Sequence, residues 1–132
     1  MANKTIFISF DYDNDRHYKN LLVAWDKNDL FDFKFYDGSV AVAVDSEDAA
    51  YIRRRINEKI NAAGYLLCIV GTDAHKSEWI AWEIDTAKAL GLSLIAVKTA
   101  SSNTSPAGLL NAGATWARSF TFESIKTAVD SA

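Results

Sequence analysis

One pair of residues near the middle of the chain has the types and the spacing that could support chemistry. Trp79 and Glu83 lie four residues apart in a segment with helical character, so their side chains share a face. That face flanks the apolar stripe of Ile80 and Ile84, which places the pair beside the buried side of the helix. A carboxylate held beside an indole can stabilise positive charge that develops during a reaction. We therefore take this pair as the candidate centre of an active site.

The elements that must position this pair are well marked. Residues 65–70 form an unbroken apolar run, which predicts a strand buried on both faces. The turn at Gly71 follows, Ser77 is a suitable N-cap, and Gly91 supplies the end of the helix. The pattern therefore predicts a strand, a loop and a helix over 65–90, with Glu83 close to the carboxyl end of a central strand.

Other residue types that carry chemistry lack supporting partners. The histidines, His17 and His75, are far apart and have no matching carboxylates, so we expect no metal site. Neither Ser9 nor Ser77 stands in the glycine elbow of a hydrolase nucleophile. The single cysteine, Cys68, falls inside the apolar run and is expected to be a small buried hydrophobe. Glycine-rich phosphate-binding motifs are also absent from the sequence.

Composition restricts the class of protein. The chain has 132 residues, 49% of them hydrophobic and 23% charged, which fits one globular domain over 1–132. The net charge of -3 gives no basis for binding nucleic acid. No apolar run approaches the roughly 18 residues of a membrane span, and the first residues lack the features of a signal peptide. We expect a cytoplasmic protein without membrane contact.

Strand-like and helix-like segments alternate along the chain. Strands are expected at 5–10, 33–36, 65–70, 92–97 and 118–122, and helices at 16–28, 46–63, 77–90 and 123–132. Because each strand–helix unit takes about 30 residues, the strands should run parallel with helices on both faces. We expect a flavodoxin-like three-layer α/β sandwich whose five-stranded parallel sheet has the order 2-1-3-4-5.

This strand order also predicts where a ligand binds. The crevice of such a sheet opens at the carboxyl ends of strands 1 and 3, where loops 11–15 and 71–76 meet. The helix after the first loop is expected to begin at Arg16, with Asn14 or Asp15 as its N-cap. Segment 37–48 allows either a hairpin or a long loop that leads to the next helix, and we favour the loop.

Two stretches resemble a known family. Residues 4–10, Lys-Thr-Ile-Phe-Ile-Ser-Phe, resemble the first-strand box of Toll/interleukin-receptor (TIR) domains. Residues 77–84, Ser-Glu-Trp-Ile-Ala-Trp-Glu-Ile, resemble the S-x-W-x-x-x-E-[IL] box of the same family. The layout most closely resembles the bacterial TIR-like domains of the Thoeris antiphage defence system, and the similarity spans nearly the whole chain.

The resemblance implies an activity and a catalytic residue. In active members of the family the glutamate of the box cleaves the nicotinamide–ribose bond of NAD, which gives that role to Glu83. The resemblance gives a role to no other residue. From its position one turn before Glu83, we expect Trp79 to wall the pocket, and we expect Phe10, Asp11 and Tyr12 of the first loop to meet the ligand from the other side. We expect segment 37–48 to fold over the ligand as a lid, with Asp45 among the ligand-binding residues.

The resemblance also implies partners. We expect NAD as the substrate, no further cofactor, and an ADP-ribose-derived signal, free, cyclic or conjugated, that acts on a separate effector protein in antiviral defence. Active members generally assemble, so a homo-oligomer is expected, with Trp82 as a candidate interface residue.

Alternatives remain open from the sequence. Trp79 could serve packing alone, and Glu83 could be a solvated helix residue. The domain could be a catalytically silent adaptor that binds partners through its helix surfaces. A degenerate response-regulator receiver would use Asp73 as its phosphoryl acceptor, but the expected fifth strand is not followed by the required lysine.

Overall fold

The computed structural model of the chain describes residues 4–35 and 46–132, and its centre is a parallel sheet. Within these residues the strands are β1 (Lys4–Ser9), β2 (Phe31–Lys34), β3 (Tyr65–Val70), β4 (Ser93–Lys98) and β5 (Thr115–Trp116). They form a five-stranded sheet of order β2-β1-β3-β4-β5, and every neighbouring pair is parallel. The predicted fold class and strand order are confirmed.

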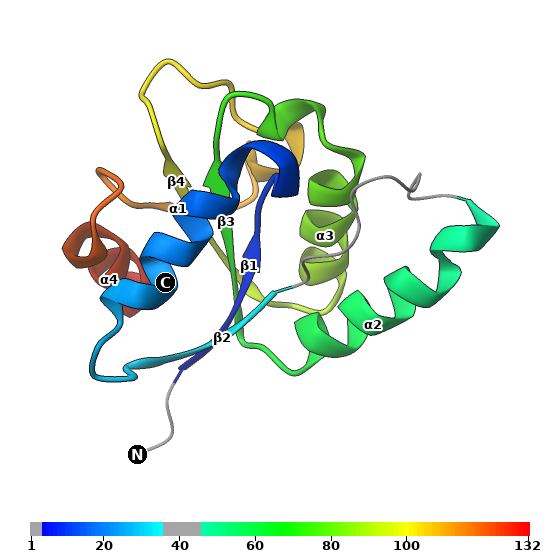
Figure 1. The fold of residues 1–132 in the computed structure, drawn as a ribbon, viewed down its shortest axis with the longest axis horizontal. Coiled ribbons are helices and arrows are strands. Elements are labelled where there is room, and N and C mark those ends of the chain that lie inside the picture. The colour runs from blue at the N-terminus through cyan, green and yellow to red at the C-terminus, as the bar shows by residue number, and fades with distance from the viewer. Residues whose placement is uncertain (1–3, 36–45) are drawn as a thin grey trace.

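Helices cover both faces of this sheet. They are α1 (Tyr12–Trp25), α2 (Ala50–Asn61), α3 (Glu78–Ala89) and α4 (Phe122–Ser131), with short 3₁₀ turns η1 (Glu47–Ala49), η2 (Ala74–Lys76) and η3 (Ala107–Leu109). Helices α1 and α4 lie on one side of the sheet and α2 and α3 on the other (Figure 1). The three layers therefore place the carboxyl ends of β1 and β3 between the starts of α1 and α3.

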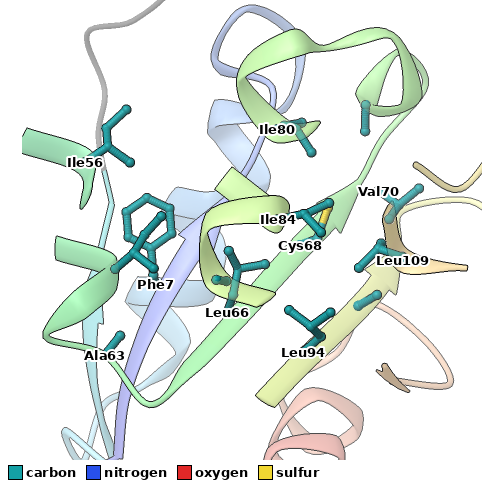
Figure 2. Packing of buried hydrophobic residues seen from close by; sticks show 14 residues of the cluster. Phe7, Ile56, Ala63, Leu66, Cys68, Val70, Ile80, Ile84, Leu94 and Leu109 are labelled. Atoms are coloured by element: carbon teal, nitrogen blue, oxygen red, sulfur yellow. The ribbon is translucent and has the colours of Figure 1, made fainter. Parts of the chain in front are cut away.

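Strand residues alternate between two hydrophobic cores. On the α2/α3 side, Phe7, Leu66 and Cys68 are completely buried in one cluster, which Figure 2 shows beneath helix α3. On the α1/α4 side, the alternate positions Ile8 and Leu67 belong to a second cluster. Because β1 and β3 are buried on both faces, their near-continuous apolar sequences are explained.

The start of α1 differs from the prediction. The helix begins at Tyr12 rather than Arg16, because Asp11 has an extended backbone and its side chain accepts a hydrogen bond from the Asp13 N–H. Asp11 is therefore the N-cap, and the predicted caps Asn14 and Asp15 lie inside the first turns. Acidic residues in the first turn favour the positive end of the helix dipole, which stabilises this longer helix.

Helix α1 also ends earlier in the chain than predicted, and strand β2 begins earlier than predicted. Helix α1 ends at Trp25 because the buried Asp26 turns its carboxylate toward the next segment. Its two oxygens accept hydrogen bonds from the N–H groups of Leu30 and Phe31, at 2.8 and 2.9 Å. This contact begins β2 at Phe31, two residues before the predicted strand at 33–36.

The predicted fifth strand at 118–122 is wrong. Strand β5 is the short segment Thr115–Trp116, which pairs with Ile95 and Ala96 of β4. The aromatic residue Phe120 instead packs against rings of α1, with its centroid 5.1 Å from that of Tyr18. The alternating pattern of segment 118–122 comes from aromatic residues that contact the helix layer. Sequence periodicity alone does not distinguish such contacts from pairing in a strand.

Other predicted elements agree closely with the structure. Ile56 and Ile60 of α2 are fully buried, and Ser77 caps α3 by accepting a hydrogen bond from the Ile80 N–H at 3.1 Å. Gly91 follows α3 with a φ of 80°, a conformation that glycine adopts without strain. The choice between a loop and a hairpin falls mostly on residues 36–45, outside the described part. None of the described helices is long and apolar enough to cross a membrane.

Candidate active site

The carboxylate of Glu83 lies at the carboxyl edge of the sheet, where the sequence placed it. Glu83 is 6% exposed, and its Oε1 accepts a hydrogen bond of 2.8 Å from the hydroxyl of Ser9. Ser9 is the last residue of β1 and is fully buried. Glu83 is therefore held next to the start of the first loop. The alternative of a solvated helix glutamate is wrong.

Packing of α3 fixes this position. Ile80 and Ile84 are fully buried and anchor the helix on the sheet, as Figure 2 shows. Glu83 precedes Ile84 and so lies beside the apolar stripe, close enough to the sheet to reach β1. Ser9 pairs in register with Cys68 of β3. The residue whose hydroxyl holds Glu83 therefore lies where β1 is paired with β3.

Burial determines the protonation of the groups here. It raises the pKa of Glu83 to about 8, although the hydrogen bond from Ser9 acts in the opposite direction. Near neutral pH the carboxyl group of the unliganded chain is therefore mostly protonated. Burial, followed by the charges of Glu83 and Asp15, raises the pKa of the Cys68 thiol, which makes it a poor nucleophile. The expectation of a buried, unreactive cysteine agrees with this.

A second buried carboxylate, Asp15, lies at the same edge. It is 4% exposed, and none of the described residues donates a hydrogen bond to its Oδ2. Burial raises its pKa to about 6; the negative charges of Asp11 and Asp73 add to this effect, and His17 opposes it. A side chain at Gly71 would overlap the Asp15 carboxylate, so glycine is needed where β3 ends.

Polar contacts join the two loops at this edge. The amide of Asn14 donates to Asp11 Oδ2 at 2.8 Å and to Asp73 Oδ2 at 3.4 Å. Lys76 places its ammonium group 3.9 Å from Asp73 Oδ1. The first turn of α1 and the loop after β3 are thus linked by side chains, as expected for the switch point of this strand order.

The other predicted residues of the first loop make structural contacts. Phe10 is buried in the second cluster, with the Lys19 ammonium group 5.6 Å from its ring centroid. The hydroxyl of Tyr12 accepts a 2.8 Å hydrogen bond from Arg16, whose guanidinium also lies 4.9 Å from the ring centroid. Asp45 is outside the described residues. The ligand-binding roles assigned to Phe10, Asp11, Tyr12 and Asp45 stay predictions.

Trp79 and Trp82 form a pair on α3. Their ring centroids are 5.9 Å apart in an edge-on arrangement, and both are partly buried against the first cluster. Trp79 therefore has a packing role, whether or not it also lines a ligand pocket. Trp82 packs against the same cluster as Trp79, and its role as an interface residue stays a prediction.

Sequence reasoning missed three residues at this edge. Ser9 was considered only as a nucleophile, Asp15 only as a helix cap, and Gly71 only as the end of a strand. The alternation along β1 was a usable signal for Ser9, because the residue shares a face with Phe7 and so faces the layer that holds Glu83. Nothing in the sequence indicated that Asp15 would lie buried against Gly71.

Two further observations concern other kinds of site. Within 4–35 and 46–132, no three His, Cys, Asp or Glu residues are placed so that they could hold a metal ion. An open groove of about 510 Å³ lies away from Glu83, between the end of α1 and the start of α4. Its lining residues are Trp25, Lys27, Phe120, Thr121, Phe122 and Glu123.

The parallel sheet of order β2-β1-β3-β4-β5, with a buried glutamate on the helix after β3, is the arrangement expected of a TIR-like domain. The model of the family described as "Thoeris protein ThsB, TIR-like domain" matches residues 7–104, which include Ser9 at the end of β1, all of β3 and Glu83. The chain belongs to this family. No curated protein matches it.

Solved structures show the same fold. A conserved protein from Enterococcus faecalis is 21% identical with a TM-score of 0.60, covering 76% of this chain and 66% of that one. A 2-desoxiribosyltransferase from Leishmania mexicana is 24% identical with a TM-score of 0.54, covering 74% and 65%. A prokaryotic SEFIR domain is 13% identical with a TM-score of 0.54, covering 98% and 89%. The chain thus spans slightly less than two thirds of the first two proteins.

Proposed function

We propose that this TIR-like domain cleaves the bond between nicotinamide and ribose in NAD, and that Glu83 is the catalytic residue. The observation that carries the proposal is the buried Glu83 carboxyl group, fixed by Ser9 at the edge where this fold binds ligands. Membership in the family of Thoeris TIR-like domains supports the choice of NAD. A protein named 2-desoxiribosyltransferase shares the fold, so this architecture is compatible with ribosyl chemistry.

The reaction requires a carboxylate more than an acid. When the bond from ribose C1′ to the nicotinamide nitrogen breaks, the electron pair leaves with nicotinamide, which becomes neutral without needing a proton. The ribose ring is left with positive oxocarbenium character, which a nearby anion stabilises. In a desolvated site this attraction is strong, because water does not screen it. Glu83 has both the charge type and the low-dielectric surroundings for this task.

Substrate binding supplies the ionised form of Glu83. With a pKa of about 8, the unliganded carboxyl group holds its proton near neutral pH. The nicotinamide ring of NAD carries a positive charge, and a cation near a carboxyl group favours ionisation. The proton leaves to solvent as the substrate binds. Water, or a hydroxyl group of the ADP-ribosyl cation itself, then attacks C1′ and releases its proton to solvent. The result is free or cyclic ADP-ribose, which acts on a separate effector protein.

The test is mass spectrometry of small molecules after the purified protein has been incubated with NAD at high protein concentration. We expect release of nicotinamide, and Glu83→Gln should lower the rate by about 100-fold or more. Glu78→Gln is the matched control, because Glu78 is exposed in the first turn of the same helix. Equal rates for the wild type and Glu83→Gln would remove Glu83 from the mechanism. A folded wild type that never consumes NAD would instead favour the silent adaptor.

A further inference from the structure

We infer that Asp15 is a second ligand-binding carboxylate of this site and that it binds the vicinal hydroxyl groups of the ribose whose bond Glu83 breaks. The inference rests on the proposed function for the identity of the sugar. The existence of the site is argued independently of that function, from Asp15 and its surroundings. The first observation is that Asp15 is 4% exposed while its Oδ2 has no hydrogen-bond donor among the described residues.

An unsatisfied buried carboxylate oxygen is costly and rare in folded proteins. Here the neighbouring charges increase that cost, because Asp11 and Asp73 are both negative and only His17 opposes them. Replacing the carboxylate by a neutral group would relieve the part of this cost that comes from its charge. The place of Asp15 in the first turn of α1 favours its negative charge but supplies no donor for Oδ2 among the described residues, whereas a ligand that donates hydrogen bonds would.

The surroundings of Asp15 are shaped to hold its carboxylate. It lies against Gly71, where even a methyl group would overlap it, so the end of β3 leaves space that the carboxylate fills. The backbone N–H of Asp15 donates to the Asp11 carbonyl at 2.7 Å, which fixes the start of the helix.

Both carboxyl groups lie at one edge. Glu83 is held by Ser9 at the end of β1, and Asp15 lies against Gly71, directly after the end of the neighbouring strand β3. The two acids therefore approach the carboxyl ends of β1 and β3 from different helices, Asp15 from α1 and Glu83 from α3. A sugar at this edge would lie within reach of both.

The chemistry favours hydroxyl groups over a metal ion as the ligand. Within the described residues no three acidic, histidine or cysteine side chains are placed to hold a metal. A carboxylate accepts hydrogen bonds at both oxygens, and the adjacent hydroxyl groups of a ribose donate two. NAD contains two riboses, and proximity to Glu83 selects the one attached to nicotinamide.

The binding test uses ADP-ribose, measured by isothermal titration calorimetry on Glu83→Gln protein so that no turnover interferes. Adding Asp15→Asn should weaken binding by about 10-fold or more, because the charged acceptor is lost. Asp13→Asn is the matched control: it removes the same charge from an exposed position in the same helix turn, and binding should stay within about 2-fold. Equal losses for both variants, or no binding at all, would overturn the inference.

Analogues identify the sugar. ADP-ribose that lacks the 2-hydroxyl of the terminal ribose should bind more weakly to the Asp15 protein, and Asp15→Asn should remove most of that difference. If instead only an analogue that lacks hydroxyl groups on the adenosine ribose binds more weakly in a manner that depends on Asp15, the assignment to the nicotinamide ribose is overturned. Thermal unfolding separates binding from folding: Asp15→Asn should melt no lower than the parent protein, and a lower melting temperature with normal affinity would contradict a ligand role.

The outcomes separate this inference from the proposed function. Asp15-dependent binding of ADP-ribose by a protein that never cleaves NAD would support the inference and count against the proposed activity. Cleavage of NAD with an unchanged KM in Asp15→Asn would support the activity and overturn the inference.

Discussion

Burial raises the pKa of Glu83, the proposed catalytic group, and the hydrogen bond from Ser9 moderates that rise. Burial alone would raise the pKa of Glu83 further, and the hydroxyl group limits that rise because it donates to the carboxylate. Ser9 therefore acts through Glu83, as a positioning residue rather than a catalytic one. Its contribution should be visible as a change in pH dependence, which a purely structural serine would not cause.

We predict a shifted pH profile for Ser9→Ala. In the wild type, kcat/KM for NAD cleavage should rise with pH and level off above about 8, where Glu83 of the free protein is ionised. Without the hydrogen bond the pKa of Glu83 rises, so the profile should move to higher pH and the rate at pH 7 should fall about 3–10-fold.

The control for this prediction is Ser93→Ala, at the exposed start of β4. It should leave the pH profile unchanged. A lower rate in Ser9→Ala at every pH, with no shift of the profile, would show that Ser9 supports only the fold.

At the scale of elements, the sequence predicted which segments form helices and strands better than where they begin. Helix α3 was predicted nearly in full because Ser77, a good cap by type, stands directly before the apolar stripe of Ile80 and Ile84. Helix α1 was not, because Asp11 and the later acidic residues are equally good caps by type, and only the three-dimensional contact selects Asp11. The burial of Asp15 at the start of α1 could not be predicted either, because the residue types of segment 11–15 are those of an ordinary polar turn.

Asp26 gives a prediction about the link between α1 and β2. Its buried carboxylate accepts hydrogen bonds from two backbone N–H groups, Leu30 and Phe31, so Asp26→Ala leaves both without that acceptor. We expect a loss of about 2–3 kcal/mol in the free energy of unfolding, measured by urea denaturation. Asp32→Ala, which removes an exposed aspartate of β2, should cost less than about 1 kcal/mol. Similar losses for both variants would contradict this account.

Gly71 gives a prediction about the junction of β3 with the first turn of α1. Gly71→Ala places a methyl group onto the Asp15 carboxylate, and we expect a loss of about 2–3 kcal/mol in the free energy of unfolding. In an Asp15→Ala background the obstacle is gone, so the same substitution should cost less than about 1 kcal/mol.

A double-mutant cycle by urea denaturation measures this coupling. Gly64→Ala is the control, since a methyl group there would meet no neighbouring atom within 4 Å. Additive effects of the changes at positions 71 and 15 would show that the two residues do not compete for the same space.

For the whole molecule, alternating strands and helices were sufficient to predict the strand order, because parallel connections permit few arrangements. The position of Glu83 followed from that order together with its spacing from Trp79. The edge strand was the exception: β5 contributes only Thr115 and Trp116, too short a segment to leave a periodic pattern. The protonation states also lay beyond the sequence, because they depend on burial that only the assembled layers create.

Those protonation states predict how the stability of the whole molecule changes with pH. The folded pKa values of Asp15, about 6, and Glu83, about 8, exceed the ordinary values of 3.8 and 4.5 that apply when the chain is unfolded. Between these limits the folded state binds more protons than the unfolded state. The free energy of unfolding therefore falls as pH rises from about 4 to about 8.

The prediction is that neutralising both acids flattens this dependence. Urea denaturation of the wild type at pH 5, 6, 7 and 8 should show a steady loss of stability, on the order of 2–4 kcal/mol in total. Asp15→Asn should remove the part of the slope below about pH 6, and Glu83→Gln the part that extends toward pH 8. Glu58→Gln, an exposed residue of α2, should leave the slope intact. A wild type that becomes more stable over this range would mean that both carboxyl groups are solvated, and the buried site would be lost with them.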